Sequence, residues 1–391
     1  MVICLGAFIA GLTLPLADRE LAGQSPFVFQ GGPDGARSVL STIATAMISV
    51  TGLVFSITIV VLQLASSQFT PRVLSSFLSS RVTQTTLGVF TATFIYSLTV
   101  MRSVQGGFRD SDPFVPQASV TLAFALVVAS VGMFLAFIRY ITTSIQVANV
   151  VSEIGDRSVP LVHSLYPANA EDAPAAGATW SPSEETERCE LADTHRHGVV
   201  THVDFGPLIA AARSEDVVIE VLARTGEFTV EGQALARVWG ISDAGEEVRR
   251  TVLRSIGLGP ERLLDQDLAF GIRQLVDIAD RALSPSLNDP TTACQVIDEL
   301  HRILRPLVQR TSPSAYLVDD DAAVRVIHRP QTVPMLLRLG VAEVAHFGRD
   351  SPPVIEGLRS LLDELAQVAR PRYRATIDEL RDALPAPRRP Y

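Results

Sequence analysis

Residues 39–64 read VLSTIATAMISVTGLVFSITIVVLQL, and this stretch decides the fold because it contains no charged side chain. A helix needs about 20 mostly apolar residues to cross the hydrocarbon core of a bilayer. The stretch is longer than that, so it predicts a transmembrane helix.

Three other stretches near the N-terminus have the same character. Residues 83–101 and 119–138 carry no charge, and residues 1–16 are apolar but short. A signal peptide would carry basic residues before its apolar part, and residues 1–16 have none, so we expect a first transmembrane helix whose upstream half is missing. The prediction is an α-helical transmembrane domain over residues 1–140, with about four spans at 1–16, 39–64, 83–101 and 119–138.

The composition agrees with membrane insertion of part of the chain. The 391 residues have a mean hydropathy of +0.26 and 19% charged residues, whereas soluble proteins have about a quarter charged residues. The formal charge of −9 disfavours nucleic acid as a partner, because nucleic acid needs a basic face. The three cysteines lie far apart and form no metal-binding spacing or disulfide framework.

Arginines beside the predicted spans give an orientation. The connection at residues 65–82 carries Arg72 and Arg81 without an acidic residue, and Arg139 follows the last span. Positively charged connections stay in the cytoplasm, so both chain ends are expected there. We predict a multi-pass protein of the bacterial cytoplasmic (inner) membrane, in contact with the lipid bilayer, with its soluble part in the cytoplasm.

The chain changes character after the last span. Apolar residues continue at helical spacing just beyond it, and then follows a stretch rich in Ala, Pro, Glu and Ser, which is typical of a linker. The predicted parts are an amphipathic stem helix at residues 141–167, a linker at 168–197, a cytosolic α+β domain at 198–383 and a disordered tail at 384–391.

Strands and helices alternate irregularly in the predicted α+β domain. VVTHV (199–203) and DVVIEVLA (216–223) predict strands, and GEFTVEGQALARVW (226–239) predicts two more that turn at Glu231-Gly232. YLVDDDAAVRVIH (316–328) predicts a hairpin that turns on its acidic run. Helices are predicted at residues 244–255, 263–283 and 290–309, and again after 331.

A polar stripe runs along the predicted span at residues 39–64. Its members recur at intervals of three, four or seven residues, so they share one face of the helix. Small and hydroxyl residues let membrane helices pack closely, or they line a water-filled pore in a ring of identical subunits. The members are Ser38, Thr42, Thr45, Ser49, Gly52, Ser56 and Gln63.

A second polar group joins two predicted helices between residues 262 and 292. Ser284-Pro285 predicts the end of one helix, and Asp289-Pro290 predicts the start of the next, with Asp as cap and Pro in the first turn. The polar side chains either form a structural network or bind a small ion or anionic ligand at the helix N-terminus. The candidate residues are Gln266, Asp267, Arg273, Asp277, Arg281, Ser284, Asn288, Asp289 and Thr292.

Three segments carry a resemblance to a known family. GLVFSITIVVLQLASSQFTPRVL (52–74), GEFTVEGQALARVW (226–239) and RLLDQDLAFGIRQLVDIADRALSPSLNDPTTA (262–293) resemble the bacterial DUF2254 family of predicted membrane proteins. The likeness covers nearly the whole chain. The family's Ser-Gly-Tyr-Val-Gln reads HGVVT here (197–201), where Gly198 matches but Tyr and Gln are replaced. The resemblance implies the membrane topology and the importance of the 262–292 segment, but no reaction or ligand.

Two functions of different classes fit these patterns. The first is a homo-oligomer that forms a passive ion or solute channel, gated or assembled by its cytosolic domain. Ion-coupled transport is disfavoured because the predicted spans contain no ionisable residue of the kind it needs. The second is a membrane-anchored sensor or scaffold whose cytosolic domain binds a ligand or a protein partner.

An enzyme is not expected, because the chain contains no nucleophile elbow, phosphate-binding loop or zinc-protease motif. We expect no cofactor and no metal either. His195, His197 and His202 are close in sequence, but they read as the solvated start of a strand rather than as a set of metal ligands.

Overall fold

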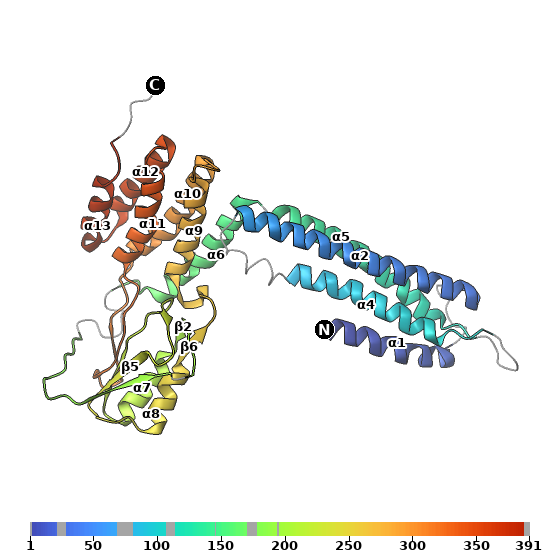
Figure 1. The fold of residues 1–391 in the computed structure, drawn as a ribbon, viewed down its shortest axis with the longest axis horizontal. Coiled ribbons are helices and arrows are strands. Elements are labelled where there is room, and N and C mark those ends of the chain that lie inside the picture. Colours follow the sequence, from blue (N-terminus) through green and yellow to red (C-terminus); the bar gives the residue numbers. More distant parts are fainter. Residues whose placement is uncertain are drawn as a thin grey trace. The chain divides into compact units, whose positions relative to one another are not determined.

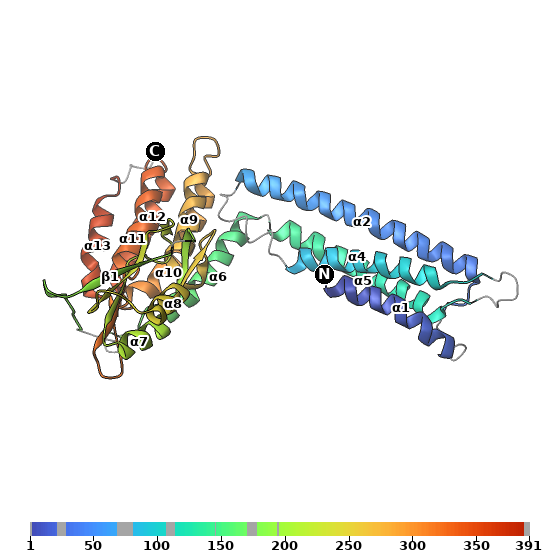
Figure 2. The same cartoon turned by 60° about the horizontal axis from the view of Figure 1, so that its bottom comes forward.

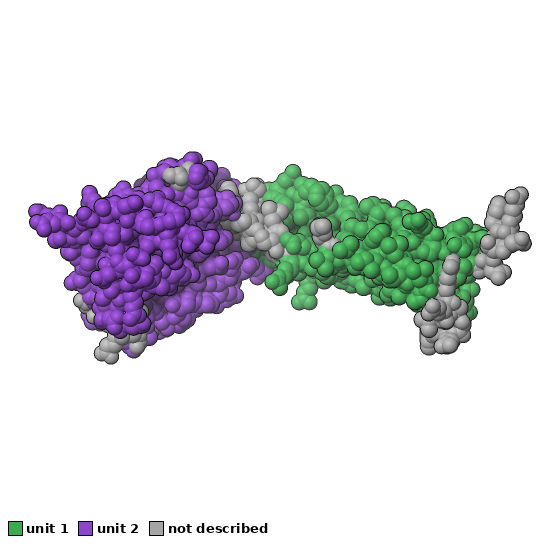
Figure 3. All heavy atoms as spheres, turned by 90° about the horizontal axis from the view of Figure 1, so that it is seen from below, with its two compact units in different colours: residues 1–146 green, residues 147–391 purple. Residues whose placement is uncertain are grey.

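The computed structural model describes residues 2–21, 29–68, 81–106, 114–144, 146–169, 178–193 and 195–386. The chain divides into two compact units, Met1–Gln146 (unit 1) and Val147–Tyr391 (unit 2), coloured separately in Figure 3. Unit 1 is helical, and unit 2 combines helices with two sheets (Figure 1).

The described part of unit 1 is a helical bundle in which α4 and α5 each contact all the other helices (Figure 2). The large side chains Phe90 and Tyr96 of α4 are fully buried. Hydroxyls of α4 are buried as well, and Thr93 lies 3.2 Å from the Ser130 hydroxyl. The helices are α1 (Val2–Leu21), α2 (Pro33–Gln68), α4 (Arg81–Ser103) and α5 (Gln117–Ser144).

Two helices of unit 1 are long and apolar enough to cross a membrane. These stretches are Pro33–Gln63 in α2 and Gln117–Thr143 in α5. Large apolar side chains stand out from both, since Phe55 is 57% exposed and Val128 is 72% exposed. Apolar surface of this kind is typical of a helix that faces lipid.

The predicted spans at residues 1–16 and 83–101 coincide with α1 and α4, but they remain predictions. The apolar part of α1, Val2–Asp18, is shorter than a usual span. α4 is less apolar because it buries hydroxyl side chains among its neighbours.

A buried carboxylate ties α1 to α5. Asp18 accepts hydrogen bonds from the Ser119 backbone N–H at 2.9 Å and from the Ser119 hydroxyl at 2.8 Å. Ser119 lies in the first turn of α5, where backbone N–H groups have no partner within the helix. Asp18 therefore acts as a cap supplied by another helix.

The predicted stem is a separate helix rather than a continuation of the last span. α5 ends at Ser144, and α6 runs from Val147 to Leu165. The Thr142 and Thr143 hydroxyls both donate to the carbonyl of Arg139. Such side-chain bonds compete with the backbone ladder of a helix, which explains a break at this point.

Unit 2 contains two sheets. The five-stranded sheet has the order β1-β5-β3-β8-β7 and is antiparallel except for β3 against β8, and the three-stranded sheet has the order β4-β2-β6. α7 (Phe205–Ser214) and α8 (Glu246–Ser255) pack on each other and contact β8 and β1. The strands are β1 (Arg188–Ala192), β2 (Gly198–Val203), β3 (Val218–Val221), β4 (Phe228–Thr229), β5 (Ala234–Trp239), β6 (Ile256–Gly259), β7 (Tyr316–Val318) and β8 (Val324–Ile327).

The remaining helices of unit 2 form a second layer with α6. α9 packs on α6, α10 and α11, and α10 packs on α6 and α12. The last four helices each have Pro in the first turn, where its missing N–H costs nothing. The elements are η1 (Leu264–Gln266), α9 (Leu268–Ala282), α10 (Pro290–Val308), α11 (Val333–Phe347), α12 (Pro352–Val368) and α13 (Pro371–Asp382).

One prediction for unit 2 needs correction, and two elements were missed. The segment predicted as a linker, 168–197, contributes the edge strand β1, whose single fully buried side chain, Leu191, gives too little alternation to be recognised. The two strands predicted at 226–239, with a turn near Gly232, are confirmed. They belong to different sheets, since β4 pairs with β2 whereas β5 pairs with β1 and β3. α7 and β6 were not predicted at all. Of the predicted tail, residues 387–391 lie outside the described residues.

A close approach between α6 and α9 gives a first testable prediction. A Cβ atom on Gly271 would lie 2.3 Å from the Ser158 Oγ and 3.0 Å from a Leu264 methyl group. We expect Gly271→Ala to destabilise unit 2 by about 1–3 kcal/mol through overpacking. Gly340→Ala in α11 is the matched control, because its Cβ would lie at an ordinary 3.4 Å from its nearest neighbour.

Denaturant unfolding of the full chain, followed by tryptophan fluorescence, measures this loss. Both tryptophans of the protein, Trp180 and Trp239, belong to unit 2 and stack at 5.8 Å, so the signal reports on that unit. Ser158→Ala should restore most of the stability lost in Gly271→Ala. Equal midpoints for Gly271→Ala and Gly340→Ala would show that the close approach is not tight.

Candidate functional site

The polar stripe of α2 lies on the outside of the bundle in unit 1. All seven members are exposed, whereas Leu40, Met47 and Val54 on the opposite side of α2 are buried. The stripe therefore does not pack against the other described helices of its own chain. Lipid, water or a second molecule has to cover it.

The hydroxyls of the stripe are bonded within the helix. Thr42 donates to the Ser38 carbonyl at 2.8 Å, Ser49 to the Thr45 carbonyl at 2.8 Å and Ser56 to the Gly52 carbonyl at 2.9 Å. These three donors are satisfied, so this part of the stripe can face lipid without an unpaired hydroxyl donor, and the oxygens can still accept from water. The geometry of the stripe is compatible with contact to lipid and with contact to water.

The predicted polar group at residues 262–292 separates into three clusters. The first surrounds Asp267, which is fully buried and caps α9. Its carboxylate accepts from the Phe270 N–H at 3.0 Å, from Arg262 Nε and Nη2 at 2.8 Å each, and from Gln331 Nε2 at 2.7 Å. Gln266 bonds elsewhere, because its Oε1 accepts from the Val203 N–H at 3.1 Å.

The second cluster surrounds Arg273 in the middle of α9. Its guanidinium lies 2.5 Å from Asp277, contacts Glu343 of α11, and lies 3.8 Å from Asp280. Burial, and then the neighbouring Glu343, raise the pKa of Asp280 to about 7. The hydrogen bond to Glu343 in turn raises the pKa of Arg273.

The third cluster is the cap of α10. Asp289 accepts from the Thr292 N–H at 3.1 Å and from the Thr292 hydroxyl at 2.6 Å, and these bonds lower its pKa. Asn288 has a φ of +46°, which closes the turn before the cap, and the Ser284 hydroxyl donates to the Arg281 carbonyl at 2.7 Å. The helix start predicted at Asp289-Pro290 is confirmed.

These clusters support the structural interpretation of the polar group over the anion-site interpretation. Arg273 is engaged by carboxylates, and the N-terminus of α10 is engaged by Asp289. Arg281 is exposed. Asp280 and Glu343, which complete the second cluster, were not among the predicted residues.

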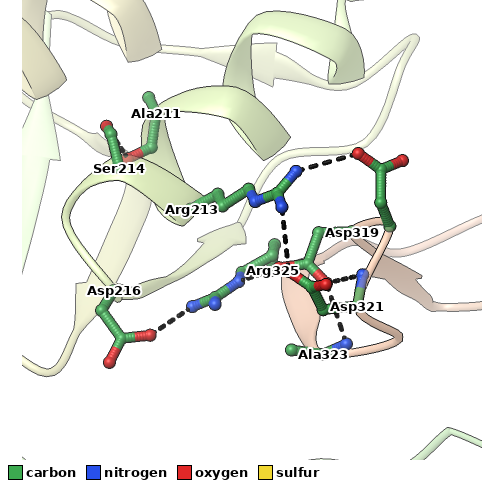
Figure 4. Close-up of polar contacts among 9 residues, drawn as sticks. Ala211, Arg213, Ser214, Asp216, Asp319, Asp321, Ala323 and Arg325 are labelled. Carbon is green, nitrogen blue, oxygen red and sulfur yellow. Dashed lines mark hydrogen bonds and ion pairs between the residues drawn. The ribbon is translucent and has the colours of Figure 1, made fainter.

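The acidic hairpin β7–β8 is likewise held by ion pairs (Figure 4). Arg325 lies 2.6 Å from Asp319 and 2.7 Å from Asp216, and Arg213 of α7 lies 2.9 Å from Asp321. The Arg325 hydrogen bond lowers the pKa of Asp319. Among the described residues, no group of three or more His, Cys, Asp or Glu could hold a metal ion.

A cavity of about 650 Å³ lies inside unit 2, within the size range of small-molecule sites. It is bounded by the C-terminal end of α6, the strands β2 and β3, the hairpin β7–β8 and the loop before α11. Apolar lining comes from Leu165, Tyr166, Val203, Phe205, Val221, Ala223 and Leu317. Polar lining comes from His163, Arg224, Thr225, Gln266, Arg310, Ser314, His328, Arg329 and Gln331.

Two of the polar side chains hold the cavity wall together. Arg310 donates to the Tyr166 carbonyl at 2.6 Å and lies 2.7 Å from His163 Nδ1, so it fixes the end of α6. His328 lies 2.9 Å from the Ser314 carbonyl, and its ring centroid lies 4.6 Å from that of Phe205 in a tilted arrangement. Burial lowers the pKa of His328.

Little in the sequence pointed to this cavity. Gln266 lines it, but it was predicted as a member of the polar group at residues 262–292. The other lining residues come from segments far apart in the chain, and no local spacing connects them. An observable signal was the isolated "HRPQ" at 328–331, which is polar although it joins a strand to a helix.

The chain is similar to proteins whose function is not known. A family described as "Predicted membrane protein (DUF2254)" matches residues 1–364. Uncharacterized proteins of Mycobacterium bovis and Mycobacterium tuberculosis are 33% identical over 344 residues, which is 87% of this chain and 65% of each relative. The chain thus spans 65% of the length of these relatives. No solved structure matches it.

Proposed function

The chain belongs to the DUF2254 family of predicted membrane proteins, and we propose that it is a membrane-anchored receptor whose unit 2 binds a small molecule. The cavity in unit 2 carries this proposal. It has the volume of a ligand site, a mostly apolar wall, and a few polar groups directed by fixed partners, a combination typical of small-molecule pockets. We place unit 2 on the cytoplasmic side, on the argument from Arg72, Arg81 and Arg139.

The position of the cavity suggests how binding reaches the membrane. Residues 163–168 at the end of α6 form part of its wall, and α6 follows the apolar helix α5 in the chain. A ligand that contacts this wall would bias the position of α6, because a ligand shifts an equilibrium by its differential affinity for two states. The proposal assigns binding, not catalysis, to the cavity.

Hydrogen–deuterium exchange of the full chain in lipid nanodiscs tests this function. The probes are octanoate, octan-1-ol and octylammonium, which share one apolar chain. At least one of them should slow exchange in residues 163–168, 310–317 and 328–331. Ala223→Phe, whose ring would occupy the cavity, should abolish the effect. The proposal fails if no probe slows exchange there, or if the filled variant responds equally.

A second candidate, a homo-oligomeric passive channel, is favoured by the exposed stripe on α2. Seven small or polar residues face away from the rest of the bundle, as the axis of a symmetric ring would require. The same face can equally meet lipid, since its hydroxyl donors are bonded within the helix. The channel therefore ranks below the receptor.

Cysteine accessibility separates the two readings of the stripe. In a variant without the native cysteines, Cys at Thr45, Ser49 or Ser56 should react with a charged methanethiosulfonate reagent if the stripe lines water. Val54→Cys is the buried control. Leu53→Cys is a control for lipid exposure, because Leu53 is 50% exposed and is not a member of the stripe. Protection of all three stripe positions in an intact oligomer would exclude the channel.

A further inference from the structure

Every charged side chain in the described lining of the cavity in unit 2 is positive. Among the described residues, the lining includes Arg224, Arg310 and Arg329 but no Asp or Glu. The chain as a whole is acidic, with 42 Asp and Glu against 33 basic residues. A cavity that gathers arginines and excludes carboxylates in such a chain attracts anions.

Arg224 is the arginine whose guanidinium has a buried nitrogen without a partner among the described residues. Its Nε is buried and has no hydrogen-bond acceptor, and its Nη1 has only the Met335 sulfur, at 3.9 Å. The nearby Glu227 carboxylate is bonded to the Arg224 backbone N–H at 2.9 Å rather than to the guanidinium. No ion pair to Arg224 occurs among the described residues.

A buried donor without an acceptor is unfavourable, and proteins seldom leave one. Arg310, in the same wall, shows the usual situation, since its guanidinium is bonded to the Tyr166 carbonyl and to His163. The Arg224 guanidinium offers a planar fork of donors that matches a carboxylate or a phosphate. An anionic ligand would supply the missing acceptor.

The rest of the wall defines the other end of the ligand. Phe205, Leu317, Val203 and Val221 contribute apolar surface, and the imidazole ring of His328 lies against Phe205. Such a wall binds an apolar body by excluding water. A free inorganic anion would leave most of the cavity unfilled.

We propose that the cavity binds an amphipathic organic anion, with its carboxylate or phosphate on Arg224 and its apolar body between Phe205 and Leu317. This inference rests on the proposed receptor function and names its ligand class. Arg224 is the selectivity-determining residue. Arg310 is a positioning residue, because its guanidinium already holds the end of α6.

The experiment compares the affinities of ligands that share one apolar chain and differ in their polar head group. Octanoate, octyl phosphate, octan-1-ol and octylammonium are titrated against the full chain in nanodiscs, with hydrogen exchange in residues 163–168 and 328–331 as the readout. Inorganic phosphate is the control that has the anionic head group but no apolar chain. We expect the two octyl anions to bind at least about tenfold more tightly than octan-1-ol, as a charge-assisted pair would give, and octylammonium to bind least. Inorganic phosphate should bind more weakly than octyl phosphate.

Substitutions then assign the selectivity to Arg224. Arg224→Met should weaken octanoate binding by about tenfold or more and leave octan-1-ol binding unchanged. Arg329→Met, an exposed arginine of the same wall, is the matched control, with an expected change below about threefold. Tryptophan fluorescence confirms that both variants fold. Arg224→Lys, which keeps the charge but not the fork, should fall in between.

The outcomes separate the inference from the function on which it rests. If octan-1-ol or octylammonium binds as tightly as octanoate, or if Arg224→Met changes nothing, the anion inference is wrong while the receptor function stands. If inorganic phosphate matches octyl phosphate, the apolar part of the inference is wrong. If none of the octyl probes binds, both the inference and the receptor function fail.

Discussion

Asp267→Ala lowers the free energy of unfolding of unit 2 by about 3–5 kcal/mol, as expected when one member of a buried ion pair is removed. Asp289→Ala lowers it by about 1 kcal/mol, the usual cost of a lost helix cap. Both residues cap helices and both belong to the polar segment at 262–292. The expected losses differ because Asp267 is more deeply buried than Asp289 and has more hydrogen-bond partners.

Removing the Asp267 carboxylate leaves three groups without their hydrogen-bond acceptor. Arg262 loses two hydrogen bonds, Gln331 loses one and the Phe270 N–H loses its cap. Among the described residues, the Asp289 carboxylate accepts only from Thr292 and from the backbone of Thr291 at the start of α10. Urea unfolding of the full chain, followed by the two tryptophans of unit 2, measures both changes. Equal losses for the two variants would show that the Asp267 network is no more than a helix cap.

Arg273→Met lowers the stability of unit 2 at pH 8 by about 3–5 kcal/mol, because it leaves carboxylates without their cation in a partly buried site. Asp277, Asp280 and Glu343 all lie within ion-pair distance of this guanidinium. The loss should shrink as the pH falls to 5, since the carboxyl groups can then take up protons. A loss that does not change with pH would contradict this explanation.

Asp280 makes the stability of unit 2 depend on pH for a different reason, namely its raised pKa. Its pKa in the folded protein is raised to about 7, above the value of about 3.9 for an unfolded Asp. Between these values the folded state binds the proton more tightly, so its contribution to stability is complete below pH 4 and is lost as the pH rises through 7. Asp280→Asn removes the titrating group, so it should stabilise unit 2 at pH 8 by about 1–2 kcal/mol and leave it unchanged at pH 4.

Local features of the fold were predictable because local chemistry causes them. The charge-free run at 39–64 gave α2 its apolar length, and Asp289-Pro290 gave α10 its first turn. Arg273 and Asp277 lie four residues apart on one helix, a spacing that brings side chains together, and they form an ion pair. Glu343 is 70 residues away from Arg273 and reaches it only through the packing of α11 on α9, so no spacing could reveal it.

The cavity was beyond sequence reasoning for the same reason. β3 pairs in parallel with β8, which lies about a hundred residues later in the chain, and the segments that follow these two strands bring Arg224 and His328 to one cavity. The end of α6 is held in the wall by Arg310, which bonds to Tyr166 and His163, and by the Tyr166 hydroxyl, which donates to the Gln331 carbonyl. The chain topology brings these residues together, although no local sequence pattern marks any of them as part of a site.

Anomalous diffraction from crystals of the full chain grown with 8-bromooctanoate tests the receptor function most directly. The bromine reports where an eight-carbon anion binds without assumptions about affinity. The account predicts a bromine peak inside the cavity, between Phe205 and Leu317, with the carboxylate against Arg224. Bromine peaks confined to the apolar surfaces of α2 and α5, with none in the cavity at saturating ligand, would contradict it.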